Sequence, residues 1–259
     1  MDYTGERLVM AAGEDLNKDL GVEDSVLKEH IERYKFAFKF IQNKKVLDIA
    51  CGTGYGSKMM VENGAREVVG ADVSATAISE ANKLRFGRSN LSFKQSNATK
   101  LLFQDDSFET VVSFETIEHI ENYQKFIQEI KRVLKPGGIL VLSTPNQTAT
   151  KQLLINNPFH IKEFNLGQFK ALISSDFESV KFFGQRKINK LSFEQKIIRL
   201  AYQIYSKIKF LHFLSRLIPA KKKHKLGQGM TGANDDYQIN GLEPGQMYLY
   251  LIAVANNKK

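Results

Sequence analysis

A glycine-rich loop close to a carboxylate is the part of this sequence that points most directly to chemistry. The apolar run Val46–Ile49 leads into three glycines at alternate positions from Gly52 to Gly56, and Asp48 lies inside the run. A dinucleotide loop follows the pattern G-x-G-x-x-G, which would place glycine where this chain has Ser57. Asp48 is also poorly placed for a pyrophosphate and suits a cation. The loop therefore disfavours a hydride-transferring dehydrogenase, the alternative reaction class.

A second carboxylate, Asp72, comes twenty residues after Gly52, at the end of the next strand-like run. At this place in a parallel sheet, a carboxylate can accept hydrogen bonds from both hydroxyls of a ribose. The two carboxylates and the glycines together predict a ligand that contains a ribose but no pyrophosphate that the loop must bind.

Strands and helices alternate around these residues. Strands are expected at 45–50, 66–72, 91–97, 108–115, 137–145, 177–185 and 246–255, and helices at 22–42, 56–64, 74–86, 123–134 and 163–175. Such alternation implies right-handed crossovers and a mostly parallel sheet. The predicted class is α/β, and Ser74 is the expected N-cap of its helix.

Composition is that of a globular protein. The chain has 259 residues, 42% hydrophobic and 25% charged, and its one cysteine, Cys51, excludes an internal disulfide. No run reaches the roughly 18 to 20 apolar residues of a membrane span, and the opening lacks the features of a secretory signal. We expect a cytoplasmic, single-domain protein (1–259), with a core of 22–185 and 246–259 and an insertion at 186–245.

Positive charge is concentrated in that insertion. The whole chain carries a net charge of +9, yet Arg186 to Lys225 alone holds twelve Lys and Arg against one acid, Glu194. Apolar residues recur there at near-helical spacing. We expect a helical cap over an acceptor pocket with a solvated basic face. A helix lying on an anionic membrane is the second interpretation, and nucleic-acid binding the third, because no recognisable RNA-binding module is present.

Residues 28–145 resemble class I S-adenosylmethionine-dependent methyltransferases. Five signals fall in that family's order: the glycine loop with Asp48, then Asp72, "SNATKL" at 96–101, "VVSFETIEHI" at 111–120 and "VLKPGG" at 133–138. The resemblance implies a Rossmann-like, doubly wound, seven-stranded sheet and S-adenosylmethionine as the cofactor.

The resemblance also assigns cofactor contacts. It places the methionine part near the glycine loop, the ribose at the end of the second strand and the adenine after the third. Asn97 stands where many relatives have Asp, and its amide oxygen can still accept from the adenine amine. The implied cofactor-binding residues are Tyr34, Asp48, Gly52, Gly54, Asp72, Val73, Asn97, Ala98 and Glu115.

Two histidines are candidates for a catalytic base, which a hydroxyl acceptor would need. His160 lies in "NPFHIKEF", which resembles the corresponding stretch of quinone-type and glycan-modifying O-methyltransferases. His119, in "ETIEHI", is the second candidate, with a capping or packing role as the alternative. We expect no metal, although Glu115, Glu118 and His119 are close in sequence and some relatives bind magnesium near this position.

The expected acceptor is a small polar molecule or glycan. The opening "YTGERLV" resembles that of methyltransferases encoded with surface-polysaccharide enzymes, which favours O-methylation in capsule or lipopolysaccharide biosynthesis. A membrane-associated quinone- or lipid-type methyltransferase is the alternative, and an RNA methyltransferase is less favoured.

Overall fold

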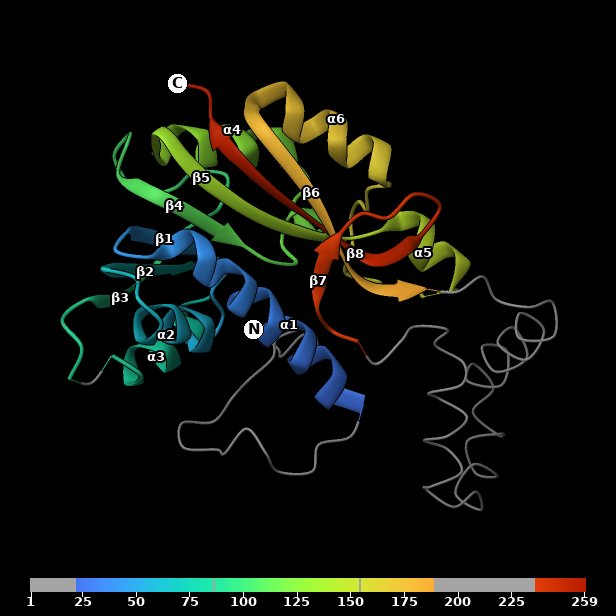
Figure 1. Ribbon diagram of the computed structural model, residues 1–259. Helices are drawn as coiled ribbons and strands as arrows, with labels where there is room; N and C mark the ends of the chain where they lie inside the picture. Colours follow the sequence, from blue (N-terminus) through green and yellow to red (C-terminus); the bar gives the residue numbers. More distant parts are fainter. Residues whose placement is uncertain (1–21, 86, 154, 189–235) are drawn as a thin grey trace, which may run out of the picture.

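The computed structural model describes residues 22–85, 87–153, 155–188 and 236–259 (Figure 1). Its strands are β1 Lys45–Ile49, β2 Glu67–Asp72, β3 Leu91–Gln95, β4 Phe108–Ser113, β5 Leu134–Pro145, β6 Phe177–Ile188, β7 Ile239–Gly241 and β8 Met247–Asn257. Its helices are α1 Val22–Ile41, α2 Tyr55–Glu62, α3 Ala75–Lys83, the 3-10 turn η1 Ile117–His119, α4 Tyr123–Val133, α5 Gln147–Gln152 and α6 Leu166–Asp176. Each helix and strand predicted within residues 22–185 and 246–255 is present, with shifted ends.

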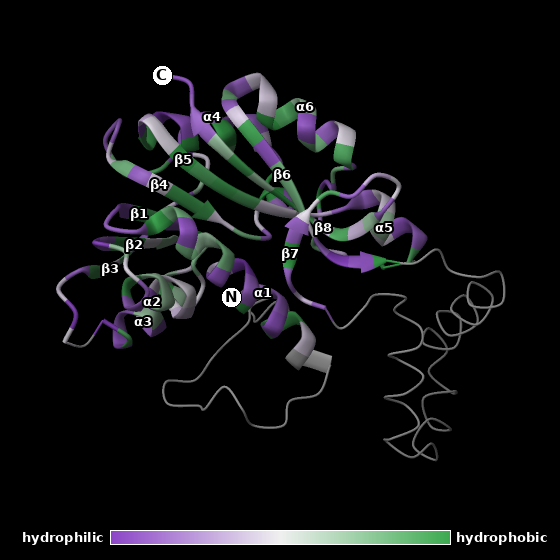
Figure 2. Ribbon diagram, in the orientation of Figure 1, coloured by the Kyte–Doolittle hydropathy of each residue, from purple (hydrophilic) through white to green (hydrophobic). Residues whose placement is uncertain are grey.

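The sheet lies between two helical layers. Its two faces are distinguished by alternate strand residues: Val46 packs in one core with α1, α2 and α3, whereas Leu47 packs in the other with α4 and α6. Figure 2 shows hydrophobic residues concentrated along β4 and β5, in the middle of the sheet. These strands are buried on both faces, as expected of parallel strands covered by helices.

The strand order is β3-β2-β1-β4-β5-β8-β6-β7. Strands β1 to β5 pair with one another in parallel, and β8 pairs antiparallel with both β5 and β6. The α/β class and mostly parallel sheet are therefore confirmed, but the sheet formed by the described residues has eight strands rather than seven. The extra strand, β7, lies in a stretch predicted to be a loop. The sequence did not indicate it because three residues are too few to show an alternating pattern.

The order of the strands reverses between β1 and β4. In open parallel sheets, a crevice forms beyond the carboxyl ends of the strands at such a point. The glycine loop follows β1 and the "FETIEHI" segment follows β4, so the fold brings these two motifs to one crevice.

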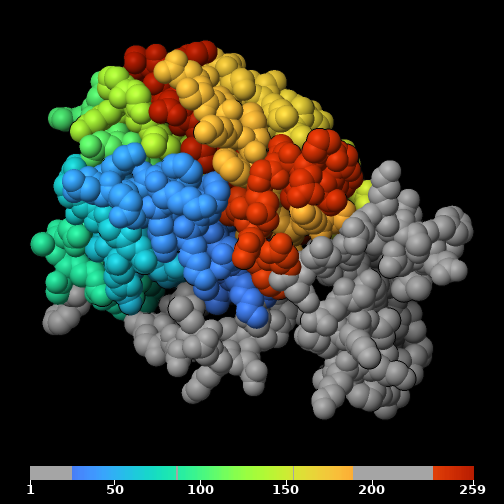
Figure 3. Space-filling view, in the orientation of Figure 1, coloured from blue at the N-terminus to red at the C-terminus, as the bar shows by residue number. Residues whose placement is uncertain are grey.

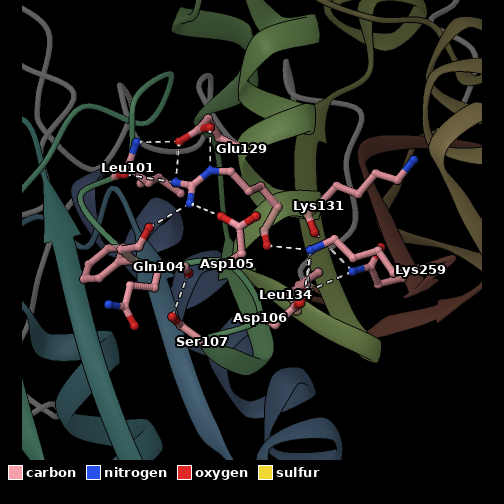
Figure 4. Close-up of polar contacts among 12 residues, drawn as sticks. Leu101, Gln104, Asp105, Asp106, Ser107, Glu129, Lys131, Leu134 and Lys259 are labelled. Atoms are coloured by element: carbon pink, nitrogen blue, oxygen red, sulfur yellow. Dashed lines mark hydrogen bonds and ion pairs between the residues drawn. The ribbon is translucent and has the colours of Figure 1, made fainter.

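A polar cluster on α4 holds the connection between β3 and β4 (Figure 4). The Arg132 guanidinium donates to the carbonyls of Leu101 and Phe103 and to the carboxylates of Asp105 and Glu129. Glu129 in turn accepts from the Leu101 amide at 2.7 Å. This connection begins with the residues expected to border the adenine, so the cluster fixes one side of the crevice.

The base of the predicted insertion is attached to α1. Gln185 Nε2 donates to the carbonyls of Glu29 and Tyr237, and Arg186 forms an ion pair with Glu29 at 2.5 Å. Figure 3 shows α1 beside the C-terminal strands. Residues 186–188 belong to β6 and 239–241 to β7, both within the stretch predicted as an insertion. The predicted cap at 189–235 lies outside the described residues.

Among the described residues, no helix has the length and apolar character that crossing a bilayer requires.

Candidate active site

A cavity of about 650 Å³ lies at the carboxyl ends of β1, β2 and β4, against α1. It is the site that the sequence motifs predicted. The predicted residues that line it are Tyr34, Gly52, Asp72, Val73, Asn97, Ala98, Glu115 and His119. Three others, Asp48, Gly54 and His160, do not line it and lie behind its wall.

The glycine loop passes close to β3. Gly54 has φ +84°, and a Cβ atom there would lie 2.6 Å from the Phe93 ring. Both the left-handed backbone and the close approach require glycine. Gly54 therefore shapes the loop without lining the cavity.

Two non-glycine residues at the cavity also have positive φ. Ala50, after β1, has φ +60° and Glu115, after β4, has φ +48°. Such strained conformations cost of order 1–3 kcal/mol and often occur at functional sites. Here the strain coincides with the two strand ends that meet at the crevice.

Asp48 is buried beneath the loop. Its carboxylate accepts from Ser57 Oγ at 2.6 Å and from the Tyr34 hydroxyl at 3.3 Å. Burial raises the pKa of Asp48 to about 7, although these two hydrogen bonds lower it. The carboxyl is thus poised to change charge near neutral pH.

The Asp48 carboxyl should make stability depend on pH. The folded protein keeps the proton up to a pKa of about 7, whereas the reference pKa is 3.8, so the unfolded chain loses it first. The stability this group contributes is full below the unfolded pKa and is lost as the pH rises through the folded one. As the pH rises from 5 to 8, wild type should lose stability that Asp48→Asn keeps. The unfolding free energy of Asp48→Asn should therefore rise by about 1–3 kcal/mol relative to that of wild type over this range.

Urea denaturation at several pH values measures this difference. Glu178→Gln, at an exposed position on β6, is the matched control and should follow the wild-type profile. Parallel profiles for wild type and Asp48→Asn would contradict the prediction.

Asp72 ties the loop to the end of β2. One carboxylate oxygen accepts from the Gly52 amide at 3.0 Å and the other from the Ser74 amide at 2.8 Å. Ser74 caps α3 as predicted, through its hydroxyl and the Ala77 amide. Each carboxylate oxygen has a second lone pair, so Asp72 can hold the loop and still accept from a ligand.

Asn97 uses its amide oxygen locally. Oδ1 accepts from both the backbone amide and the hydroxyl of Thr99, each at 2.9 Å. This oxygen was expected to accept from the adenine amine. In the structure it stabilises the turn that places residues 97–99 in the cavity wall.

Arg33, which the sequence analysis missed, is fully buried next to Glu115 and is not itself among the residues that line the cavity. Its side chain is 0% exposed and stacks on the Tyr250 ring at 4.1 Å. NH1 lies 3.9 Å from Glu115 Oε1, and none of the three guanidinium nitrogens has a hydrogen-bond partner among the described residues. Buried donors without a hydrogen-bond partner are costly, which indicates a place for a further acceptor beside Glu115. Helical periodicity marked only the apolar face of α1 and gave no signal for Arg33.

His30, also on α1, lines the cavity and was not assigned a role from the sequence. Burial, and then the charge of Arg33, lower the pKa of His30 well below 6.5. A neutral imidazole therefore lies at this end of the cavity.

Two carboxylates follow β4. Glu115 lines the cavity and accepts from Ser143 Oγ at 2.6 Å. Glu118 is fully buried; its Oε2 accepts from Thr144, and its Oε1 has no hydrogen-bond partner among the described residues. Burial, and then the nearby Glu115, raise the pKa of Glu118 well above its usual value. Glu118 therefore favours its protonated form.

His119 lines the cavity with a defined tautomer. Its Nδ1 lies 3.1 Å from the Phe159 carbonyl oxygen, which can only accept. Nδ1 therefore carries the hydrogen and the lone pair is on Nε2. Nε2 lies 4.0 Å from Glu118 Oε1, and a neutral imidazole with this tautomer can receive a proton there.

His160 lies behind His119, with ring centroids 4.9 Å apart. Its Nδ1 is 2.7 Å from Glu163 Oε1, and its Nε2 is 3.0 Å from Asn157 Nδ2. Both ring nitrogens thus contact the loop that carries His160. The structure places His119, rather than the preferred candidate His160, at the cavity.

Glu118, His119 and His160 each have a potential metal-ligating atom within 4.8 Å of the others. The cluster differs from the Glu115, Glu118 and His119 set considered from the sequence, because the 157–163 loop brings in His160. Both His160 ring nitrogens already have protein partners, so a metal would have to displace one of them.

Comparisons with known proteins indicate the family of this chain. Residues 41–215 match the family model described as "Methyltransferase domain". A probable S-adenosylmethionine-dependent methyltransferase of Mycobacterium tuberculosis is 32% identical over 188 residues, covering 71% of this chain and 64% of that protein. A ubiquinone biosynthesis O-methyltransferase of Chelativorans sp. is 36% identical over 121 residues, covering 46% of this chain and 47% of that protein.

A solved structure shares the fold. Phosphoethanolamine N-methyltransferase 2 of Haemonchus contortus, in complex with S-adenosyl-L-methionine, aligns with a TM-score of 0.56 and 17% identity, covering 88% of this chain and 53% of that one. The chain spans about two thirds or less of the curated relatives described above. The family-model match covers more than half of the chain, so this protein belongs to the S-adenosylmethionine-dependent methyltransferase family.

Proposed function

We propose that this chain transfers the methyl group of S-adenosylmethionine to a hydroxyl oxygen of a small acceptor, with His119 as the base. The observation that supports this proposal most is His119 itself: it lines the cavity, and the Phe159 carbonyl orients it so that Nε2 can receive a proton. When bound, the cofactor supplies a methyl group activated by a positively charged sulfonium.

The side chains at and beside the cavity have chemistry that suits the parts of this cofactor. Asp72 can accept from the ribose hydroxyls, and Val73, 63% exposed, offers an apolar side chain beside it. The three guanidinium nitrogens of Arg33 have no hydrogen-bond partner within the described part of the chain, and such donors suit the carboxylate of the methionine part. We assign Arg33 to that carboxylate and Asp48 to the charge balance beneath the loop.

The protein's own part in the reaction is alignment and proton transfer. In-line displacement forms the oxygen–carbon bond as the carbon–sulfur bond breaks, and that electron pair stays on sulfur. Holding the two reactants about 3 Å apart in line removes much of the barrier. His119 Nε2 takes the hydroxyl proton, which adds about 10²–10⁴-fold to the rate.

The acceptor we favour is a polyhydroxylated sugar of a surface polysaccharide or its activated precursor. The segment after β4 offers Thr116, Glu121 and Asn122 to the cavity. Among the described residues that line it there is no Lys or Arg, since Arg33 lies outside the lining, next to Glu115. Polar and acidic groups suit a neutral polyol better than an anion at the reacting end. A cytoplasmic location stays a prediction.

A prenylated quinol or lipid is the second candidate. Phe159 is 44% exposed and Ile161 61% exposed in the loop beside His119. This apolar surface, and the ubiquinone biosynthesis O-methyltransferase among the relatives, favour an acceptor with an apolar body. Contact of the basic insertion with an anionic membrane belongs to this second proposal.

A panel of acceptors tests the two proposals. Formation of S-adenosylhomocysteine is measured with nucleotide-activated hexoses, their deoxy analogues, a short-chain demethylubiquinol and a primary amine. The first proposal expects turnover with a hexose that is lost in one deoxy analogue. Turnover with the quinol alone would favour the second candidate, and turnover with the amine alone would contradict transfer to oxygen.

Asp72→Ala should weaken cofactor binding. The substitution leaves two ribose hydroxyls without their acceptor and loosens the Gly52 amide, which costs about 1–3 kcal/mol, or roughly 5- to 150-fold in Kd. Calorimetry with S-adenosylmethionine measures the effect. Asp106→Asn, at a carboxylate on the β3–β4 connection paired with Lys259, is the control. Unchanged affinity of Asp72→Ala would contradict the ribose assignment.

A further inference from the structure

The loop from Asn157 to Glu163 is organised around the His160 ring. Asn157 Oδ1 accepts from the Phe159 amide at 3.0 Å, which fixes the orientation of the Asn157 side chain. Its Nδ2 therefore faces His160 Nε2, at 3.0 Å, and must donate to it. The hydrogen of His160 is consequently on Nδ1, which donates to Glu163 Oε1 at 2.7 Å.

Glu163 anchors this arrangement to α5. Its second oxygen accepts a short hydrogen bond from Thr150 Oγ1. Burial raises the pKa of Glu163, but the hydrogen bonds from His160 and Thr150 together lower it by more than burial raises it. The net pKa therefore lies below 4.5. An ionised Glu163 can only accept, which is consistent with the hydrogen on His160 Nδ1.

The same loop reaches the cavity at Phe159, the residue before His160. The Phe159 amide is held by Asn157, and the Phe159 carbonyl accepts from His119 Nδ1 at 3.1 Å. Two further amides, those of Ile161 and Lys162, donate to the Glu118 carbonyl at 2.8 and 3.0 Å. The loop is thus fastened on both sides of Phe159, and the carbonyl that orients His119 has a fixed position.

We propose that His160 is a positioning residue which, through Asn157 and the Phe159 backbone, holds His119 in the tautomer that presents the Nε2 lone pair. The proposal deepens the proposed function and rests on it, because it takes His119 as the base and makes His160 the residue that orients this base. It explains why both His160 ring nitrogens are engaged within the loop. His160 orients the base and receives no proton from the acceptor.

The same contacts give the loop a second effect. Because Asn157 fixes the Phe159 backbone, the Phe159 ring is held in the cavity wall while 44% exposed. Loss of the His160 contacts should therefore disturb the base and the acceptor surface together, while the glycine loop and Asp72, on β1 and β2, stay unchanged.

The test observes the His119 tautomer directly and needs no acceptor. Long-range ¹H–¹⁵N spectra of the full chain with ¹⁵N-labelled histidine distinguish protonated from unprotonated ring nitrogens, and the chain has five histidines to assign. In wild type, we expect a single Nδ1–H tautomer for His119. His160→Leu and Asn157→Ala, which interrupt the contacts at two points, should both populate the Nε2–H tautomer to tens of per cent.

A conservative variant separates positioning from simple stability. In His160→Gln, the amide can accept from Asn157 and donate to Glu163, so the His119 tautomer should return toward wild type. Gln168→Ala removes the capping box of α6, immediately after the loop, and should leave the His119 tautomer unchanged. Thermal melts and the affinity for S-adenosylmethionine confirm that each variant is folded.

Two outcomes would overturn the proposal. One is an unchanged His119 tautomer in both His160→Leu and Asn157→Ala. The other is a shift of the wild-type His160 signals on adding Mg²⁺ or Zn²⁺, which would make His160 a metal ligand. These outcomes differ from failure of the proposed function, in which His119→Asn retains methyl transfer whatever the tautomer spectra show.

Discussion

Replacing His119 by asparagine should lower kcat by about 10²–10⁴-fold, the usual contribution of a positioned base. The asparagine amide can still donate to the Phe159 carbonyl, which His119 Nδ1 contacts at 3.1 Å, so the loop should keep its position. The transition state alone loses an interaction, because no group then receives the hydroxyl proton. The measurement is kcat with the acceptor that the panel identifies.

Controls distinguish a base from a residue that shapes the cavity. Cofactor affinity of His119→Asn should stay within about twofold of wild type, since the change removes no contact assigned to the cofactor. His160→Gln should retain much more turnover than His119→Asn. Near-wild-type kcat for His119→Asn would show that another group, with His30 as the next to test, takes the proton.

Arg33→Met should produce the largest loss of cofactor affinity. A charge-assisted contact between a buried guanidinium and a carboxylate contributes strongly, and truncating one partner costs about 2–5 kcal/mol. This corresponds to a Kd for S-adenosylmethionine weakened by roughly 30- to 5,000-fold. Methionine keeps the length and apolar character of the side chain, so its packing against Tyr250 is largely retained.

A ligand without the carboxylate is the matched control for Arg33→Met. Decarboxylated S-adenosylmethionine lacks the group assigned to Arg33, so wild type should bind it much more weakly than the intact cofactor. Arg33→Met should bind the two ligands with nearly equal affinity. Arg66→Met, a more exposed arginine paired with Glu109, should behave like wild type. If Arg33→Met discriminates as well as wild type, the carboxylate binds elsewhere.

Most of the helices and strands, though not α5 and β7, and the cofactor loop were predictable from the sequence because their signals are local. Apolar periodicity predicted α1 and α4, Ser74 marked the start of α3, and the glycine loop followed its strand. Spacing also placed Asp72 at the end of β2, where its carboxylate meets the Gly52 amide. Each of these features depends on residues that are neighbours in the chain or on a repeating pattern.

The assignments that needed the structure depend on side-chain partners. Asn97 was expected to accept from the adenine amine with its amide oxygen, which stays a prediction; the structure adds that this oxygen accepts twice from Thr99. Arg33 gave no signal, because an arginine on an amphipathic helix ordinarily faces solvent. Its burial is decided by Tyr250, more than two hundred residues later in the chain.

By itself, the sequence determined the α/β class, the order of the main elements and the cofactor loop, because backbone propensities, glycine conformations and strand-end positions are set by local residue types. Only the tertiary structure decided that β8 lies between β5 and β6, that Arg33 is buried beside Glu115, and that His119 rather than His160 lines the cavity. A histidine's role depends on what each ring nitrogen contacts. For His119 that partner is the Phe159 carbonyl, forty residues away in sequence, and only folding brings the two together.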